Sequence, residues 1–212
     1  MRNWLKGGVL VLLCWAQGAL AGTVLVVGDS ISAAFGLETS QGWVQLLQQR
    51  LDTENLDHRV VNASISGDTS AGGLARLPAL LAEYDPEVVI IELGGNDGLR
   101  GQPLKQLNRN LAAMVDLSRE ADAEVVLLGM RLPPNLGQRY TSAFAEAFDS
   151  LADERNLPYV PFFLEGHTKN AIAKALTVQR VDSSADKAEK VKPLELKSGS
   201  RLAAIRDRGV LR

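Results

Sequence analysis

Cysteine and histidine are scarce in this chain of 212 residues. The single cysteine, Cys14, excludes an internal disulfide framework. That cysteine and the two histidines, His58 and His167, show no metal-ligand spacing, so we expect no metal site. The chain also lacks G-x-x-x-x-G-K-[ST] and a G-x-G-x-x-G motif after a strand, which argues against a nucleotide-binding or phosphate-binding module.

The first 21 residues have the pattern of an export signal. A basic region, an apolar run and a small-x-small cleavage site follow one another: Arg2 and Lys6, Val9–Trp15, and Ala19-Leu20-Ala21. The apolar run is too short to cross a bilayer. We expect a mature chain that begins near Gly22, is periplasmic or secreted, and has no stable membrane insertion. A hydrophobic first helix and a lipid anchor at Cys14 are the weaker alternatives.

Charge is unevenly distributed, although the formal net charge is only −2. Residues 22–167 hold 10 Lys/Arg against 20 Asp/Glu, a balance of −10, whereas residues 168–212 hold 11 against 5, a balance of +6. No aromatic residue follows Phe163. We interpret residues 168–212 as an atypical basic tail, solvated and poorly packed or disordered, in preference to a segment that binds nucleic acid or anionic lipid.

Apolar, β-rich runs alternate with helical patterns between residues 22 and 167, which predicts one α/β domain with a five-stranded parallel sheet. The expected strands are Thr23–Gly28, Arg59–Ala63, Glu87–Leu93, Glu124–Met130 and Pro158–Phe163. The expected helices are Gln41–Leu51, Ala71–Tyr84 with a restart at Pro78, Pro103–Glu120, Arg139–Arg155 and a short one at Ser200–Arg208.

Small polar residues follow the first three strands: Ser30, then Gly67, then Asn96. Because the carboxyl ends of parallel strands share one edge of a sheet, we expect these three residues to converge there. A serine hydroxyl can attack a carbonyl carbon where nearby donors hold the oxyanion that forms. The backbone N–H groups of Ser30 and Gly67 and the side-chain amide of Asn96 would supply three such donors.

Each of these residues also has a purely structural interpretation. Ser30 suits the cap of a following helix, Asp68 or Thr69 suits the next cap, and Asn96-Asp97-Gly98 suits a turn. We interpret Asp29 and Asp97 as carboxylates that order these loops rather than as catalytic acids.

Three segments, VVGDSISAAFG, VVNASISGDTSAGGLARLPALL and VIIELGGNDGLRG, resemble the first three motif blocks of the SGNH, or GDSL-type, ester hydrolases. The resemblance is to the bacterial periplasmic thioesterase I, lysophospholipase and arylesterase group, and it covers about Thr23 to Gly166. It implies a flavodoxin-like three-layer α/β/α sandwich, Ser30 as nucleophile, and Gly67 and Asn96 in the oxyanion hole. It also implies hydrolysis of a small-molecule acyl ester or thioester by a monomer, without a metal or cofactor.

The last motif of that family, Asp-x-x-His, has no counterpart in this chain. His58 precedes the second strand, at the edge opposite the expected site, and we expect a surface residue. His167 follows the fifth strand at the correct edge but has no acid three residues before it, which makes it a weak candidate for the base. A change of reading frame near codon 166 is the simplest hypothesis for the atypical ending. The sequence therefore predicts a serine ester hydrolase with an unassigned base, or else a non-catalytic acyl-binding protein of the same fold.

Overall fold

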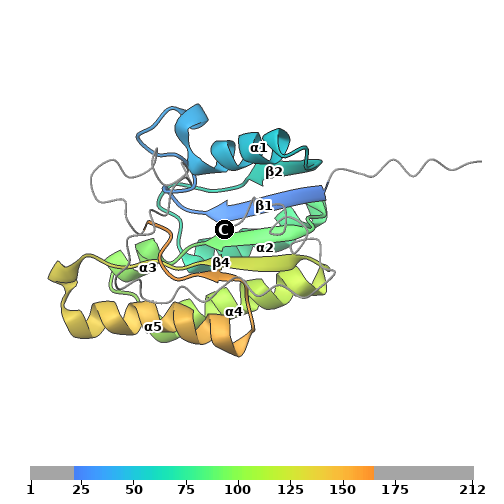
Figure 1. Ribbon diagram of the computed structural model, residues 1–212. Helices are drawn as coiled ribbons and strands as arrows, with labels where there is room; N and C mark the ends of the chain where they lie inside the picture. The colour runs from blue at the N-terminus through green and yellow to red at the C-terminus, as the bar shows by residue number, and fades with distance from the viewer. Residues whose placement is uncertain (1–21, 165–212) are drawn as a thin grey trace, which may run out of the picture.

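A parallel sheet of five strands forms the centre of the structure, a computed structural model that describes residues 22–164 (Figure 1). The strands are β1 (Gly22–Gly28), β2 (His58–Asn62), β3 (Val88–Glu92), β4 (Glu124–Leu128) and β5 (Tyr159–Val160). Their order in the sheet is β2-β1-β3-β4-β5, and every neighbouring pair is parallel. This is the flavodoxin-like order, as predicted. β2 is added on one side of β1, and β3, β4 and β5 are added on the other, so the switch point of the strand order lies between β1 and β3.

Helices cover both faces of the sheet. They are α1 (Trp43–Thr53), α2 (Ser70–Tyr84), α3 (Gly95–Leu99), α4 (Leu104–Glu120) and α5 (Gln138–Glu154), with short 3-10 turns at Thr39–Gln41 (η1) and Pro134–Leu136 (η2). Side chains alternate between the two faces of a strand, so Leu25 and Val27 pack with α2, α4 and α5, whereas Val24 and Val26 pack with Trp43 of α1. Every residue of β3 is buried, as its apolar sequence predicted.

Three predicted elements differ from the structure. Helix α2 continues through Pro78 instead of restarting there, because Leu77 and Leu81 on either side of the proline are both buried in the core. The Asn96-Asp97-Gly98 stretch lies within α3 and is not only a turn. Strand β5 is shorter than predicted because Pro161 has no N–H to continue the ladder.

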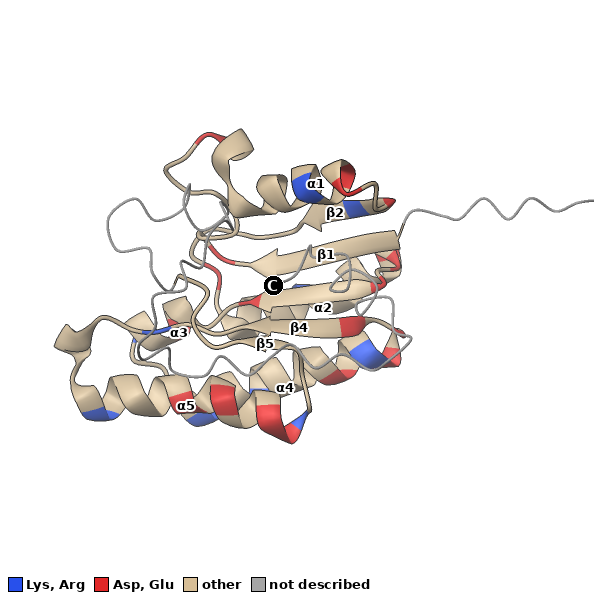
Figure 2. Cartoon of the chain, in the orientation of Figure 1, with Lys and Arg blue, Asp and Glu red and all other residues tan. Residues whose placement is uncertain are grey.

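Charged residues lie on the helices and at the ends of the strands, whereas the middle of the sheet is uncharged (Figure 2). Within residues 22–164, no helix combines the length and apolarity needed to span a membrane. The expected signal peptide, the basic tail and the helix at Ser200–Arg208 lie outside the described residues.

Candidate active site

A cavity of about 180 Å³ opens at the carboxyl ends of β1, β3 and β4. Ser30 and Asn96 both line it, as the strand positions predicted. The other residues around it come from the turn after β1, from β3 and α3, from the segment after β4 and from the end of the described chain: Asp29, Ile31, Glu92, Gly95, Leu99, Gly129–Pro133 and Phe162–Leu164.

A tight turn carries Ser30 into this cavity. Asp29 Oδ1 accepts a hydrogen bond from the N–H of Ile31 (3.0 Å), and the Asp29 carbonyl accepts one from Ala33 (2.9 Å). The carbonyl of Ser30 accepts the N–H of Phe35 (3.0 Å). Residues 30–36 form turns and no helix, so Ser30 is not a helix cap. Asp29 orders the turn, as the sequence suggested.

The side-chain amide of Asn96 is held from the β1 side of the cavity. Its Nδ2 donates to Asp29 Oδ2 at 3.1 Å. An amide nitrogen carries two hydrogens, so this bond fixes the direction in which the nitrogen faces and leaves the second N–H available. Asp29 thus orders both the turn that carries Ser30 and the amide across from it.

Gly67 is placed differently, because it is exposed and is not among the residues that line the cavity. Its φ of +82° is a conformation that favours glycine. Its carbonyl accepts a hydrogen bond from Arg100 at the end of α3 (3.0 Å), and its N–H donates no hydrogen bond that is found among residues 22–164. The N–H of Ile65 donates to the carbonyl of Gly28 (3.0 Å), which ties this loop to the strand end that precedes Ser30.

Arg76 of α2 anchors the same loop from below. Its Nε donates to Asp68 (2.9 Å), and its guanidinium also reaches the carbonyls of Ala63 and Gly28. Ala63 directly follows β2 and Gly28 is the last residue of β1, so one side chain connects the ends of the two strands. Sequence reasoning did not single out Arg76 or Arg100, since nothing in a helical pattern marks a long side chain that reaches back to a loop.

A buried network links the first residue of α2 to α3 and α4. Asp97 accepts both the N–H and the hydroxyl of Ser70 (2.8 and 2.6 Å), and Asn110 of α4 donates to the same hydroxyl (2.9 Å). Thr69, not Asp68, caps α2 by accepting the N–H of Gly72 (3.3 Å). Asp97 therefore orders the loops, as its place in the sequence suggested.

Two acids lie under the cavity. Burial raises the pKa of Asp29, although the hydrogen bonds from Ile31 and Asn96 oppose the shift. Burial, and then the charge of Asp29, raises the pKa of Glu92 to about 8. Sequence reasoning missed Glu92; the signal available was an acid inside the apolar run VVIIEL, residues 88–93.

Of the two histidines, only His58 lies within the described residues, and it is at the edge of the sheet opposite Ser30. His58 begins β2, opposite Gly22, at the amino edge of the sheet. The expectation of a surface residue is wrong, because its side chain is only 17% exposed and lies 3.8 Å from the carboxylate of Glu87. The candidate base His167 lies outside the described residues.

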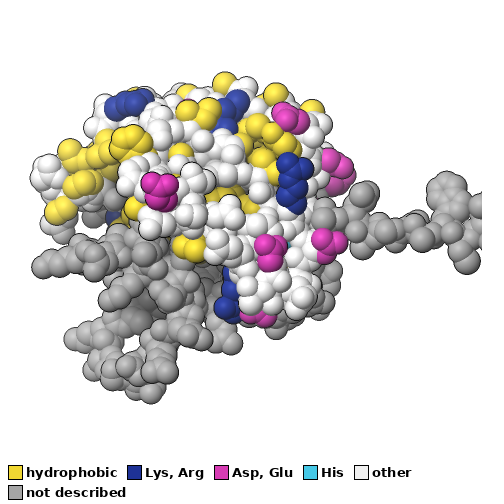
Figure 3. Space-filling model, turned by 90° about the horizontal axis from the view of Figure 1, so that it is seen from above, with side chains coloured by type: hydrophobic (Ala, Val, Ile, Leu, Met, Phe, Trp, Pro, Cys, Tyr) yellow, Lys and Arg dark blue, Asp and Glu magenta, His cyan; other side chains and the backbone are white. Residues whose placement is uncertain are grey.

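Exposed apolar side chains lie at the same edge of the sheet as the cavity, and one of them, Leu99, also lines it. They come from the loops after β1, β2, β3 and β4: Phe35 (75% exposed), Leu37, Ile65, Leu99 and Leu136. Figure 3 shows hydrophobic side chains gathered at the end of the molecule to which the strands point. This end of the protein can therefore contact an apolar ligand.

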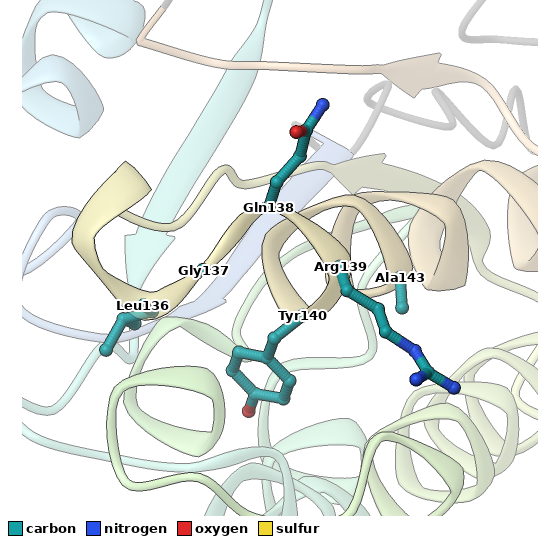
Figure 4. A pocket seen from close by; sticks show the side chains of 6 residues that line it. All are labelled: Leu136, Gly137, Gln138, Arg139, Tyr140 and Ala143. Carbon is teal, nitrogen blue, oxygen red and sulfur yellow. The ribbon is translucent and has the colours of Figure 1, made fainter.

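A second hollow of about 480 Å³ lies where η2 meets α5 (Figure 4). Its lining is Leu136–Tyr140 and Ala143, and the hydroxyl of Tyr140 donates to the carbonyl of Gly98 (3.1 Å). The side chains of Gln138 and Arg139 point in different directions. This lining includes neither Ser30 nor Asn96, both of which line the smaller cavity.

Known proteins were compared with the chain and its structure. Esterase TesA of Pseudomonas aeruginosa is 61% identical over 166 residues, which are 78% of this chain and 83% of the relative. The thioesterase 1/protease 1/lysophospholipase L1 of Escherichia coli K12 is 46% identical over 156 residues, covering 74% and 73%. The crystal structure of the esterase EstA from Pseudoalteromonas sp., inhibited by monoethylphosphonate, superposes with a TM-score of 0.67 at 42% identity, covering 73% of this chain and 90% of that one.

The model of the GDSL-like lipase/acylhydrolase family matches residues 26–186, a range that includes Ser30, Gly67, Asn96 and His167. This range is most of the chain, and it agrees with the five-stranded parallel sheet and with the motifs that follow β1, β2 and β3. The chain belongs to the GDSL-like lipase/acylhydrolase family, also called the SGNH hydrolases.

Proposed function

We propose that this protein hydrolyses carboxylic esters and thioesters of acyl groups, with Ser30 as the nucleophile. The observation that carries the proposal is that Ser30 and Asn96 line one cavity, in which Asp29 holds both the serine turn and the amide nitrogen. Family membership supports the same chemistry.

The chemistry proceeds in two displacements. Ser30 Oγ adds to the acyl carbonyl carbon and loses its proton to a base, which remains unassigned. Asn96 Nδ2 and the N–H groups of Ser30 and Gly67 donate to the oxyanion. The bond to the alcohol or thiol then breaks, the leaving group takes the proton, and water hydrolyses the acyl-enzyme. Holding the oxyanion with prearranged donors is a large part of the rate of such reactions.

The substrate class follows from the exposed apolar side chains at this edge of the sheet and from the relatives. Exposed Phe35, Ile65 and Leu99 suit an acyl chain or an aryl group. The relatives carry the names esterase, arylesterase, thioesterase and lysophospholipase, and we propose acyl thioesters, lysophospholipids and short aryl esters as substrates here. We further propose that the protein is exported, works in the periplasm or outside the cell, and is a monomer.

The test is hydrolysis of p-nitrophenyl butyrate by the purified full chain and by its Ser30→Ala variant. Removing the nucleophile of the serine hydrolase subtilisin lowers turnover by about 10⁶-fold, so Ser30→Ala should reduce the rate to the background. Ser142→Ala, at an exposed position of α5, is the matched control. Equal rates for the wild-type and Ser30→Ala proteins would refute the proposal.

A non-catalytic acyl-binding protein is the second candidate, favoured by the missing Asp-x-x-His motif. A fluorophosphonate reagent separates the two, because it bonds covalently only to an activated serine. Labelling of the wild-type protein that disappears in Ser30→Ala supports the hydrolase. Binding of a fatty acid without labelling or turnover supports the second candidate.

A further inference from the structure

Glu92 is a buried acid that the proposed mechanism does not use. It is the last residue of β3, opposite Gly28 in the sheet, and it is 1% exposed. It is also one of the residues that line the cavity with Ser30 and Asn96. A buried carboxyl beside a reacting centre needs an explanation, because its charged form is costly to bury.

A chain of hydrogen bonds joins Glu92 to the turn that carries Ser30. Trp43 Nε1 donates to Ser32 Oγ (3.2 Å), and Ser32 Oγ lies 2.6 Å from Glu92 Oε2. Since an indole N–H can only donate, the hydroxyl of Ser32 accepts from Trp43 and has its own proton for Glu92. The N–H of Asp29 points to the same Glu92 oxygen at 3.4 Å.

The other oxygen of Glu92 is the place for a proton. Among residues 22–164, no group makes a hydrogen bond to Oε1, although the atom is buried. Oε2 already faces two donors, so a proton on the carboxyl group belongs on Oε1. The neutral acid leaves a buried O–H without a partner, which costs less than the buried charged oxygen that the carboxylate would leave unpaired.

Gly28 leaves the space for this contact. A Cβ at Gly28 would lie 2.6 Å from Ser32 Oγ and 2.8 Å from Glu92 Oε2. The glycine before Asp29 therefore allows the serine and the glutamic acid to meet beneath the turn. Gly28 and Glu92 are paired at the ends of β1 and β3, so the backbone of the sheet fixes where the side chains of Ser32 and Glu92 meet.

The two acids differ in what stabilises a negative charge. Asp29 accepts from the N–H of Ile31 and from Asn96 Nδ2, on its two separate oxygens, which favours the carboxylate. Glu92 has donors on one oxygen only, so Asp29 takes the charge and Glu92 keeps the proton. The other charged side chains around Asp29 and Glu92 come from the loop after β2, α2, α3 and the segment after β4: Asp68, Arg76, Asp97 and Arg131.

We propose that Glu92 is a positioning residue that works as a neutral acid: it holds the Ser30 turn through Ser32, and loss of its proton adds a negative charge beside Ser32 and Trp43 and near the developing oxyanion. The proposal rests on the proposed ester hydrolysis for its effect on rate. The structural part of the proposal, the hydrogen-bonded link from Glu92 through Ser32 to Trp43, does not depend on ester hydrolysis.

Trp43 provides a readout that is independent of activity. The chain has three tryptophans, and replacing Trp4 and Trp15 by phenylalanine in the full chain leaves Trp43 alone. Fluorescence of this protein, titrated from pH 6.5 to 9.5, should show a step near pH 8. The step should be absent in Glu92→Gln and retained in Glu146→Gln, a matched change at an exposed position of α5. The same step in Glu92→Gln, or no step in the parent protein, would overturn the proposal.

The reactivity of Ser30 is the second readout, measured as the rate of fluorophosphonate labelling at pH 7 and pH 9. If only the neutral form of Glu92 supports the reaction and its pKa is about 8, the reactive fraction falls about tenfold over this range. The pH 9 to pH 7 ratio of the labelling rates should therefore be about tenfold higher in Glu92→Gln than in the parent. Equal ratios would overturn the effect on reactivity even if the fluorescence step is present.

Ser32→Ala keeps the proposal testable if Glu92→Gln does not fold. The serine hydroxyl stabilises the charged form of Glu92, so its removal should move the pH midpoint of labelling upward. An unchanged or lower midpoint contradicts the proposal. If Ser30 is never labelled, the proposed function fails, while the fluorescence titration still decides whether Glu92 holds the turn.

Discussion

Replacing Asp97 by alanine should destabilise the protein strongly. Asp97 is 1% exposed and Ser70 is completely buried, so water cannot replace the carboxylate. The change removes two hydrogen bonds to a charged group, each worth about 1.5–3 kcal/mol. It also leaves the N–H of Ser70 without an acceptor. The expected loss in the free energy of unfolding is therefore about 3–6 kcal/mol.

The assay is urea unfolding followed by far-UV circular dichroism, with the free energy extrapolated to water. Asp97→Asn should lose less than Asp97→Ala, because its amide oxygen still accepts one of the two bonds. Asp57→Ala, at an exposed position before β2, is the control and should change stability by less than about 0.5 kcal/mol. A loss below about 1 kcal/mol for Asp97→Ala would refute the importance of the network.

Three further predictions concern the site and its supports. Between pH 4.5 and 8 the folded state holds a proton on Glu92 that the unfolded state has released, so the free energy of unfolding of the wild-type protein falls as pH rises through this range. The stability difference between Glu92→Gln and wild type, from urea unfolding at several pH values, should grow accordingly, and a constant difference contradicts it. Gly129→Ala would place a Cβ 2.4 Å from the carbonyl oxygen of Pro161, so strand β5 should be displaced and the melting temperature lowered; an unchanged melting temperature would argue against this close approach. Asn96→Ala removes a donor for the oxyanion and should lower kcat for p-nitrophenyl butyrate about 10²- to 10³-fold, and a fall of less than about threefold would count against that role.

The alternation of apolar and helical patterns predicted the sheet and its main helices well. Buried parallel strands such as β3 carry long apolar runs, and α5, predicted at Arg139–Arg155, buries Phe144 and Phe148 four residues apart on one face. The failures were local. Pro78 was predicted to restart a helix, but burial of the flanking leucines keeps α2 continuous.

The location of Ser30 and Asn96 was also predictable, because in a parallel sheet the residues after each strand share one edge. The sequence could state which residues stand at that edge, since this depends only on the alternation of elements along the chain. Both residues line the cavity there. The contribution of Gly67 stays a prediction, because it lies on the loop beside the cavity and not in its lining.

The supports beneath the site could not be read from the sequence. Ser32 meets Glu92 across 60 positions of the chain, Ser70 meets Asp97 across 27, and Asn110 reaches Ser70 across 40. No periodicity connects such pairs, because the packing of separate strands and helices brings them within hydrogen-bonding distance. The chain alone specified the order of the elements and the polar side chains at their ends, while folding in three dimensions decided which hydrogen-bond donors lie beside each buried acid.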